Sequence, residues 1–77
     1  MSDALIELFA DVLAIDPDEL SDESSPETVK RWDSLAAMML VAAIEERFDV
    51  QLSTKQIMQM STIGRARKAL RRMNVAV

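Results

Sequence analysis

The sequence lacks several residue types on which enzyme and metal sites depend. Among its 77 residues there is no cysteine, no histidine and no tyrosine. The absence of cysteine excludes disulfides, zinc–thiolate sites and thiol redox centres, and it is compatible with a reducing cytosol. The absence of histidine removes the most common general base, and the remaining carboxylates and amines form no evident convergent pair. The sequence therefore indicates a protein that is neither an enzyme nor a metal binder.

Long hydrophobic runs and targeting signals are also scarce. The unbroken apolar run Leu35–Ile44 is about half as long as the ~20 residues that a membrane-spanning helix needs. The first residues, Met1-Ser2-Asp3, lack the basic stretch of a signal peptide. We therefore expect a soluble, cytoplasmic protein without a membrane span.

The chain has enough apolar residues for one small core. Hydrophobic residues make up 49% of the sequence, and no disulfide or metal set is evident to brace so short a chain, so this core must supply the stability. We expect residues 1–77 to form a single domain and the protein to be a monomer.

The charges are divided between two parts of the chain. Residues 1–49 contain all 13 acidic residues and three basic ones, a net charge of −10. Residues 50–77 contain six basic residues and no acidic one, a net charge of +6. The chain thus has an acidic first part and a basic C-terminal part.

Hydrophobic periodicity predicts helices throughout and no strand. In the first helix, apolar residues recur at i, i+3, i+4 and i+7 from Leu5, and Ser2 is the predicted N-cap. The expected helices cover residues 3–14, 34–48, 54–60 and 62–73. The predicted fold is all-α, a small four-helix bundle with a long first loop and a short third helix.

The segment 15–32, between the first two helices, has no helical periodicity and is rich in turn-forming residues. A loop of this length is uncommon in so small a domain unless it has a role or is pinned to the core. Asp16-Pro17 is expected to open one helical turn. The apolar residues expected to pin the loop are Ile15, Leu20, Val29 and Trp32.

The tripeptide Asp33-Ser34-Leu35 stands where this loop meets the second helix. A serine there lies at a helix N-terminus, where unpaired N–H groups and the helix dipole favour an attached anion. The chain has no histidine or cysteine to make this serine a nucleophile of its own. The position therefore indicates an attachment point for a phosphate-linked group that another enzyme installs. The alternative is that Asp33 and Ser34 only cap the helix.

Asp33-Ser34-Leu35 opens a helix and is followed by Leu40-Val41, Ile44-Glu45-Glu46, Phe48, and Ser53 or Thr54. In this pattern the chain resembles the acyl carrier protein family. The lengths of the first loop and of the first and fourth helices also fit the family, so the resemblance covers essentially the whole chain. The tripeptide alone is a weak signal, but it gains strength from the residues that follow.

The resemblance implies a specific chemistry. In this family a phosphopantetheinyl transferase moves 4′-phosphopantetheine from coenzyme A onto a serine Oγ, which here is that of Ser34, with Asp33 and Leu35 beside it. The thiol of the arm carries acyl cargo as a thioester, and enzymes that load and use the acyl group are the partners. The resemblance thus implies a non-catalytic carrier.

Two positions depart from the pattern of carriers that serve bulk fatty acid biosynthesis. Those carriers usually have acidic residues along the exposed side of the second helix, which partner enzymes read with basic patches. Here Ala36 and Met39 stand at two such positions, so docking is expected to be less electrostatic and more apolar. This favours a specialised carrier in a lipid, polyketide or secondary-metabolite pathway, with the general partners as the alternative. The expected partner face comprises Leu35, Ala36, Met39, Ala43, Glu45 and Glu46.

Tryptophan and methionine supply further expectations. Trp32 gives a Trp-Asp-Ser-Leu form that resembles some free-standing carriers outside bulk fatty acid synthesis, and it is expected to pack near Ala37. Met39 is expected to lie exposed on the docking side. The other methionines expected to fill the core are Met58, Met60 and Met73.

Other interpretations stay open beside the acyl carrier. An aminoacyl or peptidyl carrier has the same design, and a helical interaction module without a prosthetic group would use the methionine-rich second helix or the basic C-terminal part. Direct nucleic-acid binding is not expected, because the acidic first part repels phosphates. A second partner surface or a solvated helix face would account for the basic residues Arg65, Arg67, Lys68, Arg71 and Arg72.

Overall fold

The computed structural model describes residues 3–77, which form four α-helices and one short 3-10 helix. No strand occurs in this part of the chain, and none of its helices is long and apolar enough to cross a membrane. The all-α fold with a long first loop and a short third helix is confirmed. The elements are α1 (Ala4–Leu13), η1 (Pro17–Glu19), α2 (Ser34–Phe48), α3 (Thr54–Gln59) and α4 (Ile63–Arg72).

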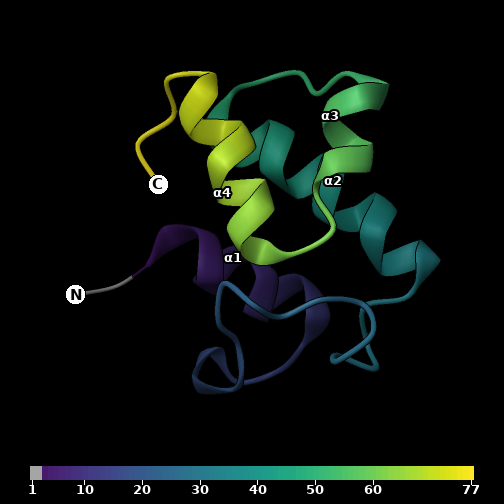
Figure 1. Cartoon of the computed structure of the whole chain (residues 1–77). Helices are drawn as coiled ribbons and strands as arrows, with labels where there is room; N and C mark the ends of the chain where they lie inside the picture. The colour runs from purple at the N-terminus through teal and green to yellow at the C-terminus, as the bar shows by residue number, and fades with distance from the viewer. Residues whose placement is uncertain (1–2) are drawn as a thin grey trace.

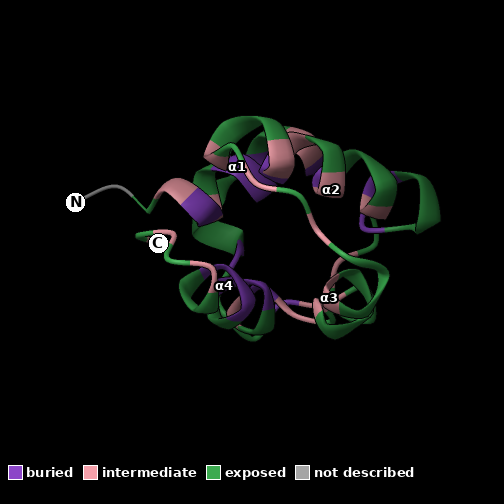
Figure 2. Cartoon of the chain, turned by 90° about the horizontal axis from the view of Figure 1, so that it is seen from above, coloured by how far each residue is buried: buried purple, intermediate pink, exposed green. Residues whose placement is uncertain are grey.

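The helices are arranged in two layers around the core (Figures 1 and 2). Seen from above, α1 and α2 lie along one side of the molecule, and α3 and α4 lie along the other. α1 packs against both α2 and α4, whereas α3 packs mainly against α4. The largest fully buried side chains come from α1, α2 and α4, and are Phe9, Leu5, Ile44, Ile63 and Leu70.

Polar side chains cap the start of every α-helix in residues 3–77. The carboxylate of Asp3 accepts hydrogen bonds from the N–H groups of Leu5 and Ile6, so it is Asp3 that caps α1. The prediction of Ser2 as this cap falls on a residue outside the described range. The caps of the later helices are Asp33, Ser53 and Thr62. Each cap satisfies an N–H group that the helix itself leaves without a partner.

The predicted helix boundaries hold to within one residue at every end. The second helix has the predicted range of 34–48, while α1 is one residue shorter at both ends than 3–14. The short turn after Asp16 is confirmed as η1, because the Asp16 carboxylate accepts from Asp18 N–H and Pro17 supplies a fixed φ.

The long first loop is held against the core, as predicted. Leu20 and Trp32 are buried, and Ile15 and Val29 are half-buried against the core. The ring of Trp32 meets that of Phe9 edge to face, with the ring centres 5.2 Å apart and the planes at 63°. Such pairs stabilise a core beyond the area they bury. The residue before the Asp33-Ser34 pair is therefore anchored.

Candidate functional site

Ser34 is the first residue of α2, and its side chain is exposed. The backbone of Asp33 is extended, with φ −97° and ψ −172°, so the chain turns into the helix between these two residues. The Asp33 carboxylate accepts a hydrogen bond of 2.8 Å from the N–H of Ala36. The hydroxyl of Ser34 is thus held at the molecular surface by a capped helix end.

The start of α2 differs from that of α4 in how its first N–H groups are used. In α4 the N–H groups of Ile63 and Gly64 donate to backbone carbonyls of the first loop, at 3.2 and 2.8 Å. Within residues 3–77 no acceptor is found for the N–H groups of Ser34 and Leu35. These free donors and the positive end of the helix dipole fit a phosphate joined to the Ser34 oxygen.

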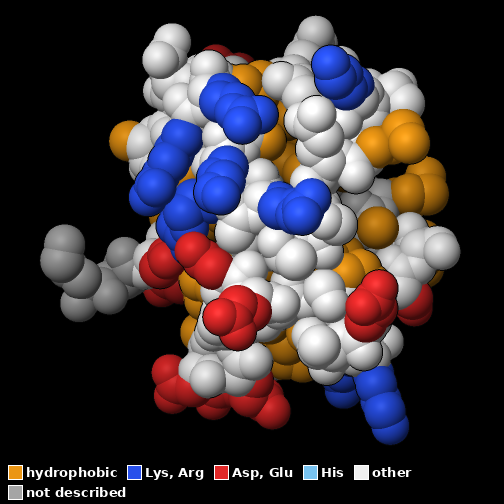
Figure 3. Space-filling model, in the orientation of Figure 1, with side chains coloured by type: hydrophobic (Ala, Val, Ile, Leu, Met, Phe, Trp, Pro, Cys, Tyr) orange, Lys and Arg blue, Asp and Glu red, His pale blue; other side chains and the backbone are white. Residues whose placement is uncertain are grey.

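The surface around Ser34 is apolar. Leu35, Met38 and Met39 of α2 have 67, 71 and 51% of their surface exposed, and Ile57 and Met58 of α3 are exposed as well. Figure 3 shows hydrophobic side chains reaching the surface on the side of the molecule where α2 and α3 lie. Contiguous exposed apolar patches are typical of interaction sites. We call these five residues the apolar face.

Not every residue of the expected partner face is exposed at the surface, where a partner could contact it. Leu35, Met39 and Glu46 are exposed, and Ala43 is half-buried. Ala36 is buried, since it repeats at i, i+4 and i+8 with the core residues Leu40 and Ile44, so the prediction that it faces partners is wrong.

Two further residues have roles that differ from those predicted. Glu45 is half-buried, and its carboxylate accepts from the N–H of Leu52 at 2.9 Å, which fixes the loop that leads to α3. Met58 is 77% exposed rather than a core residue, whereas Met60 and Met73 are half-buried. Met38 is exposed but was not included in the expected partner face. Its position next to Met39 in the sequence could have indicated that it lies on the same surface.

A small cavity lies inside the bundle beside this site. Its volume is about 50 Å³, and its lining is almost entirely apolar. Ser34, Ala37 and Val41 follow the i, i+3, i+7 spacing of one helix face, so the cavity lies beneath the face of α2 that begins at Ser34. The lining residues are Phe9, Trp32, Ala37, Leu40, Val41, Ile44, Ile57 and Met60. Trp32 and Ala37 thus line one space, in keeping with their expected proximity.

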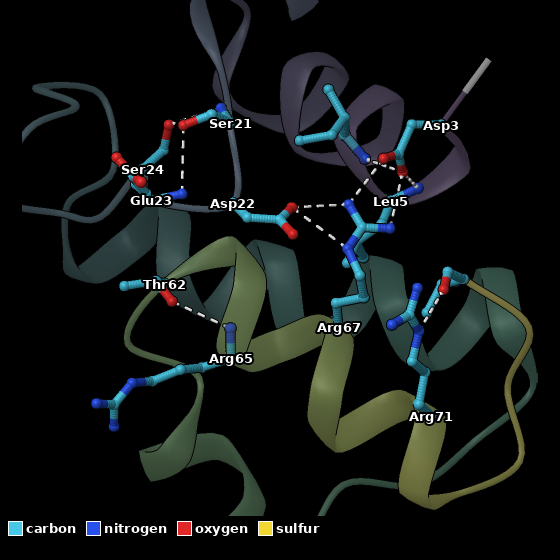
Figure 4. A network of polar contacts seen from close by, with 12 residues as sticks. Asp3, Leu5, Ser21, Asp22, Glu23, Ser24, Thr62, Arg65, Arg67 and Arg71 are labelled. Atoms are coloured by element: carbon cyan, nitrogen blue, oxygen red, sulfur yellow. Dashed lines mark hydrogen bonds and ion pairs between the residues drawn. The ribbon is translucent and has the colours of Figure 1, made fainter. Parts of the chain in front are cut away.

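Arg67 has a structural role that the sequence analysis missed. Its guanidinium bonds the carboxylates of Asp3 and Asp22, at 2.7 and 2.9 Å (Figure 4). The hydrogen bond from Arg67 lowers the pKa of Asp3 below its ordinary 3.8, although desolvation acts the other way. The same bond raises the pKa of Arg67. One buried cation thereby joins the start of α1, the first loop and α4.

Comparison with known proteins agrees with this architecture. The model of a protein family described as the phosphopantetheine attachment site matches residues 3–70. An acyl carrier protein of Sulfurovum sp. is 33% identical over 66 residues, which cover 86% of this chain and 88% of the relative. An acyl carrier protein of Clostridium acetobutylicum is 34% identical over 58 residues, 75% of each chain.

The residues matched by the family model extend over most of the chain and include the described helices α1 to α3 in full. The exposed serine at the start of α2 and the apolar surroundings lie within them. The prosthetic group of such proteins is 4′-phosphopantetheine, and proteins of this kind carry acyl groups rather than catalyse reactions. The chain belongs to the acyl carrier protein family.

Proposed function

We propose that 4′-phosphopantetheine is attached to the Oγ of Ser34, which makes this chain a carrier of acyl or related intermediates. The observation that carries the proposal is the exposed hydroxyl of Ser34 at the first position of α2, beside two N–H groups without an acceptor in residues 3–77. Phosphate linked there gains both hydrogen bonds and the helix dipole. The bound arm supplies a terminal thiol that holds cargo as a thioester.

The neighbouring residues prepare this position for a transferase. Asp33 fixes the entry into α2 by capping, and its exposed carboxylate is available to the enzyme that modifies Ser34. Leu35, Met38 and Met39 offer apolar area within one turn or so of the serine. The predicted partners are a phosphopantetheinyl transferase and the enzymes that load and use the acyl group.

The apolar face also supports a specialised role. Docking through Leu35, Met38 and Met39 depends on burial of apolar area, which salt affects far less than it affects charge pairing. We infer a cytoplasmic monomer, with a single carrier domain over residues 1–77, that serves dedicated enzymes of a lipid, polyketide or secondary-metabolite pathway. An aminoacyl or peptidyl cargo on the same arm is the alternative.

Attachment is tested by intact mass. The purified chain is incubated with coenzyme A and a broad-specificity phosphopantetheinyl transferase, and the expected product carries one phosphopantetheinyl group. Ser34→Ala should abolish the adduct while its helical circular dichroism stays unchanged, because the exposed hydroxyl makes no contact that the fold needs.

Ser61→Ala is the matched control, since Ser61 is also exposed and precedes a helix. This variant should be modified like the natural chain. An adduct that persists in Ser34→Ala would place the attachment elsewhere. Failure to form an adduct with several active transferases would favour an interaction module without a prosthetic group.

A further inference from the structure

The exposed side of α4 carries a row of cations that the carrier function does not use. Arg65, Lys68 and Arg72 are exposed and follow the i, i+3, i+7 spacing of one helix face. The opposite face of the helix packs Ile63, Ala66 and Leu70 into the core. Figure 3 shows Lys and Arg side chains gathered over this region. We call Arg65, Lys68 and Arg72 the basic face.

The helix dipole does not account for the basic face. Cations in the last turn of a helix are favourable, which explains Arg72 and its neighbour Arg71. Arg65 lies in the first turn of α4, where the dipole disfavours a positive charge. Cations three and four residues apart also repel one another. The row therefore carries an electrostatic cost in the isolated chain.

No intramolecular partner offsets this cost. Arg67 forms both ion pairs that the structure shows in residues 3–77. No carboxylate in that range lies within 4.0 Å of a basic-face nitrogen. Arg67 points to Asp3 and Asp22 on another side of the helix (Figure 4). The three cations of the basic face are thus free to meet an external anion.

The surface here is hollowed as well as charged. Arg65, Lys68 and Arg72 line a hollow of about 310 Å³ together with Gln59 at the end of α3. Arginine and lysine donors around a concave site suit carboxylates, which arginine binds through two parallel hydrogen bonds. The amide of Gln59 adds a further polar group.

The acidic first loop restricts what can bind. Arg65 and Lys68 also line a neighbouring hollow of about 360 Å³, and Asp22 of the first loop lies on its wall. Figure 3 shows Asp and Glu side chains directly below the cations on this face. At physiological salt, charges interact over about 8 Å, so an evenly negative surface would meet attraction and repulsion together.

Uniform polyanions are therefore poor partners for this face. Binding to a membrane surface is strengthened by apolar side chains that insert beside the cations, and the exposed large hydrophobic residues lie on α2 and α3 rather than on α4. Nucleic acid presents phosphates at regular intervals along its length. A folded protein can instead place carboxylates over the basic face and leave the first loop uncovered.

We propose that the basic face, Arg65, Lys68 and Arg72, is a second docking surface that binds an acidic patch on a partner protein. In both views of the ribbon, α4 lies at the opposite end of the molecule from the start of α2 (Figures 1 and 2). A partner held at α4 leaves Ser34 and the apolar face accessible. This surface thus anchors the carrier without occupying its attachment site.

The test is binding of the full chain to a synthetic helical peptide with glutamates on one face only. Amide resonances of ¹⁵N-labelled protein report the site, and those of residues 59–72 should shift. Arg65→Glu/Lys68→Glu should weaken binding by about tenfold. This variant should stay folded, because an acidic residue in the first turn of α4 is favoured by the helix dipole.

Lys30→Glu/Arg47→Glu is the matched control, with the same change in net charge at two exposed positions outside α4. It should bind the peptide within about twofold of the natural chain. An equal loss in both double variants overturns the proposal, as does a peptide that causes no shifts in α4. The proposal also fails if a single-stranded oligonucleotide, or vesicles containing phosphatidylserine, bind this face as tightly as the peptide.

Discussion

The carboxylate of Asp33 accepts from the N–H of Ala36, and its carbonyl accepts from the N–H of Ala37 at 2.9 Å. Both contacts use atoms that point into the helix, while the rest of the carboxylate is exposed. A single side chain can therefore cap α2 and still present a negative charge beside Ser34. Capping and recognition are separable, because asparagine caps helices as well as aspartate but carries no charge.

Two substitutions at Asp33 should have different effects. Asp33→Ala removes the cap and should lower the free energy of unfolding by about 1 kcal/mol. Asp33→Asn should change it by less than about 0.5 kcal/mol, yet reduce kcat/KM of the transferase about tenfold through loss of the charge. Chemical denaturation and a loading assay measure the two quantities. If Asp33→Asn is loaded with the same kcat/KM as the natural chain, the role of Asp33 is helix capping alone.

Single residues also show where sequence patterns were insufficient. Met58 belongs to an apolar pattern in α3, but the helix is only six residues long and none of its side chains is fully buried. Glu45 fits a solvent-facing pattern, and its bond to the N–H of Leu52 depends on where the next loop returns. Hydrophobic periodicity predicts which face of a helix each residue occupies. It does not predict where a neighbouring segment runs, so it cannot predict contacts with that segment.

Among the elements, α2 has apolar residues on two sides. Leu40 and Ile44 pack into the core, whereas Leu35 and Met38 are exposed by two thirds or more. The outer residues contribute little to folding, since their surface stays in contact with water. Their apolar area becomes useful only when a partner covers it.

Leu35→Ala and Met38→Ala should therefore impair docking but not folding. Each should lower kcat/KM of the transferase by about tenfold, the equivalent of the apolar area lost from the interface. The free energy of unfolding should change by no more than about 0.5 kcal/mol. Loading rates should fall only slightly with added salt. A steep salt dependence, with both variants loaded normally, would contradict apolar docking.

The junction between the first loop and α4 depends on Gly64. Its N–H donates to the carbonyl of Asp22 at 2.8 Å, and a Cβ at position 64 would lie 3.0 Å from that oxygen and 3.1 Å from the Asp22 Cβ. Contacts this short leave no space for a side chain unless the loop moves. The single glycine of the sequence thus permits a close approach of two backbones.

Gly64→Ala should destabilise the protein although alanine favours helices. The gain in helix propensity is about 1 kcal/mol, and the displaced loop should cost more than this, for a net loss of about 1 kcal/mol. Thermal unfolding of the two proteins measures the balance. A higher melting temperature for Gly64→Ala would show that the loop yields without cost.

Local signals were enough to predict the elements. Caps, turn residues and apolar spacing gave the four helices and the turn at Asp16, because these features depend on residues a few positions apart. Ser34, the proposed attachment residue, also stood out locally, at the junction of loop and helix. Burial of Ala36 followed from the same spacing and was nevertheless missed, since a small residue can occupy either face.

At the scale of the whole molecule, the ion pairs of Arg67 with Asp3 and Asp22 could not be predicted from the sequence. Arg67 is one of several cations in α4, and nothing in its spacing separates it from Lys68. Its partners Asp3 and Asp22 are 64 and 45 residues away. Only the packing of α1, the first loop and α4 brings the three together. Long-range pairing of this kind is set by the tertiary fold.

This network predicts how stability depends on pH. Arg67 lowers the pKa of Asp3 below 3.8 in the folded chain, so ionised Asp3 stabilises the fold at neutral pH, and this stabilisation is lost as the pH falls through the folded pKa. Asp3→Asn keeps the cap of α1 but removes the charge. At pH 7 it should lower the free energy of unfolding by up to about 1 kcal/mol, a modest value because Asp3 is partly solvated.

The difference between Asp3→Asn and the natural chain should shrink as the pH is lowered from 7 to below 3.8, because the natural side chain then also becomes neutral. Urea unfolding across this range measures it. Asp11→Asn is the matched control, since Asp11 is exposed on the same helix and forms no ion pair in residues 3–77. Asp11→Asn should not show this pH-dependent difference in the free energy of unfolding. Equal stability of the two proteins at every pH would show that Asp3 acts through capping alone, and that Arg67 holds the N-terminal helix by packing rather than by charge.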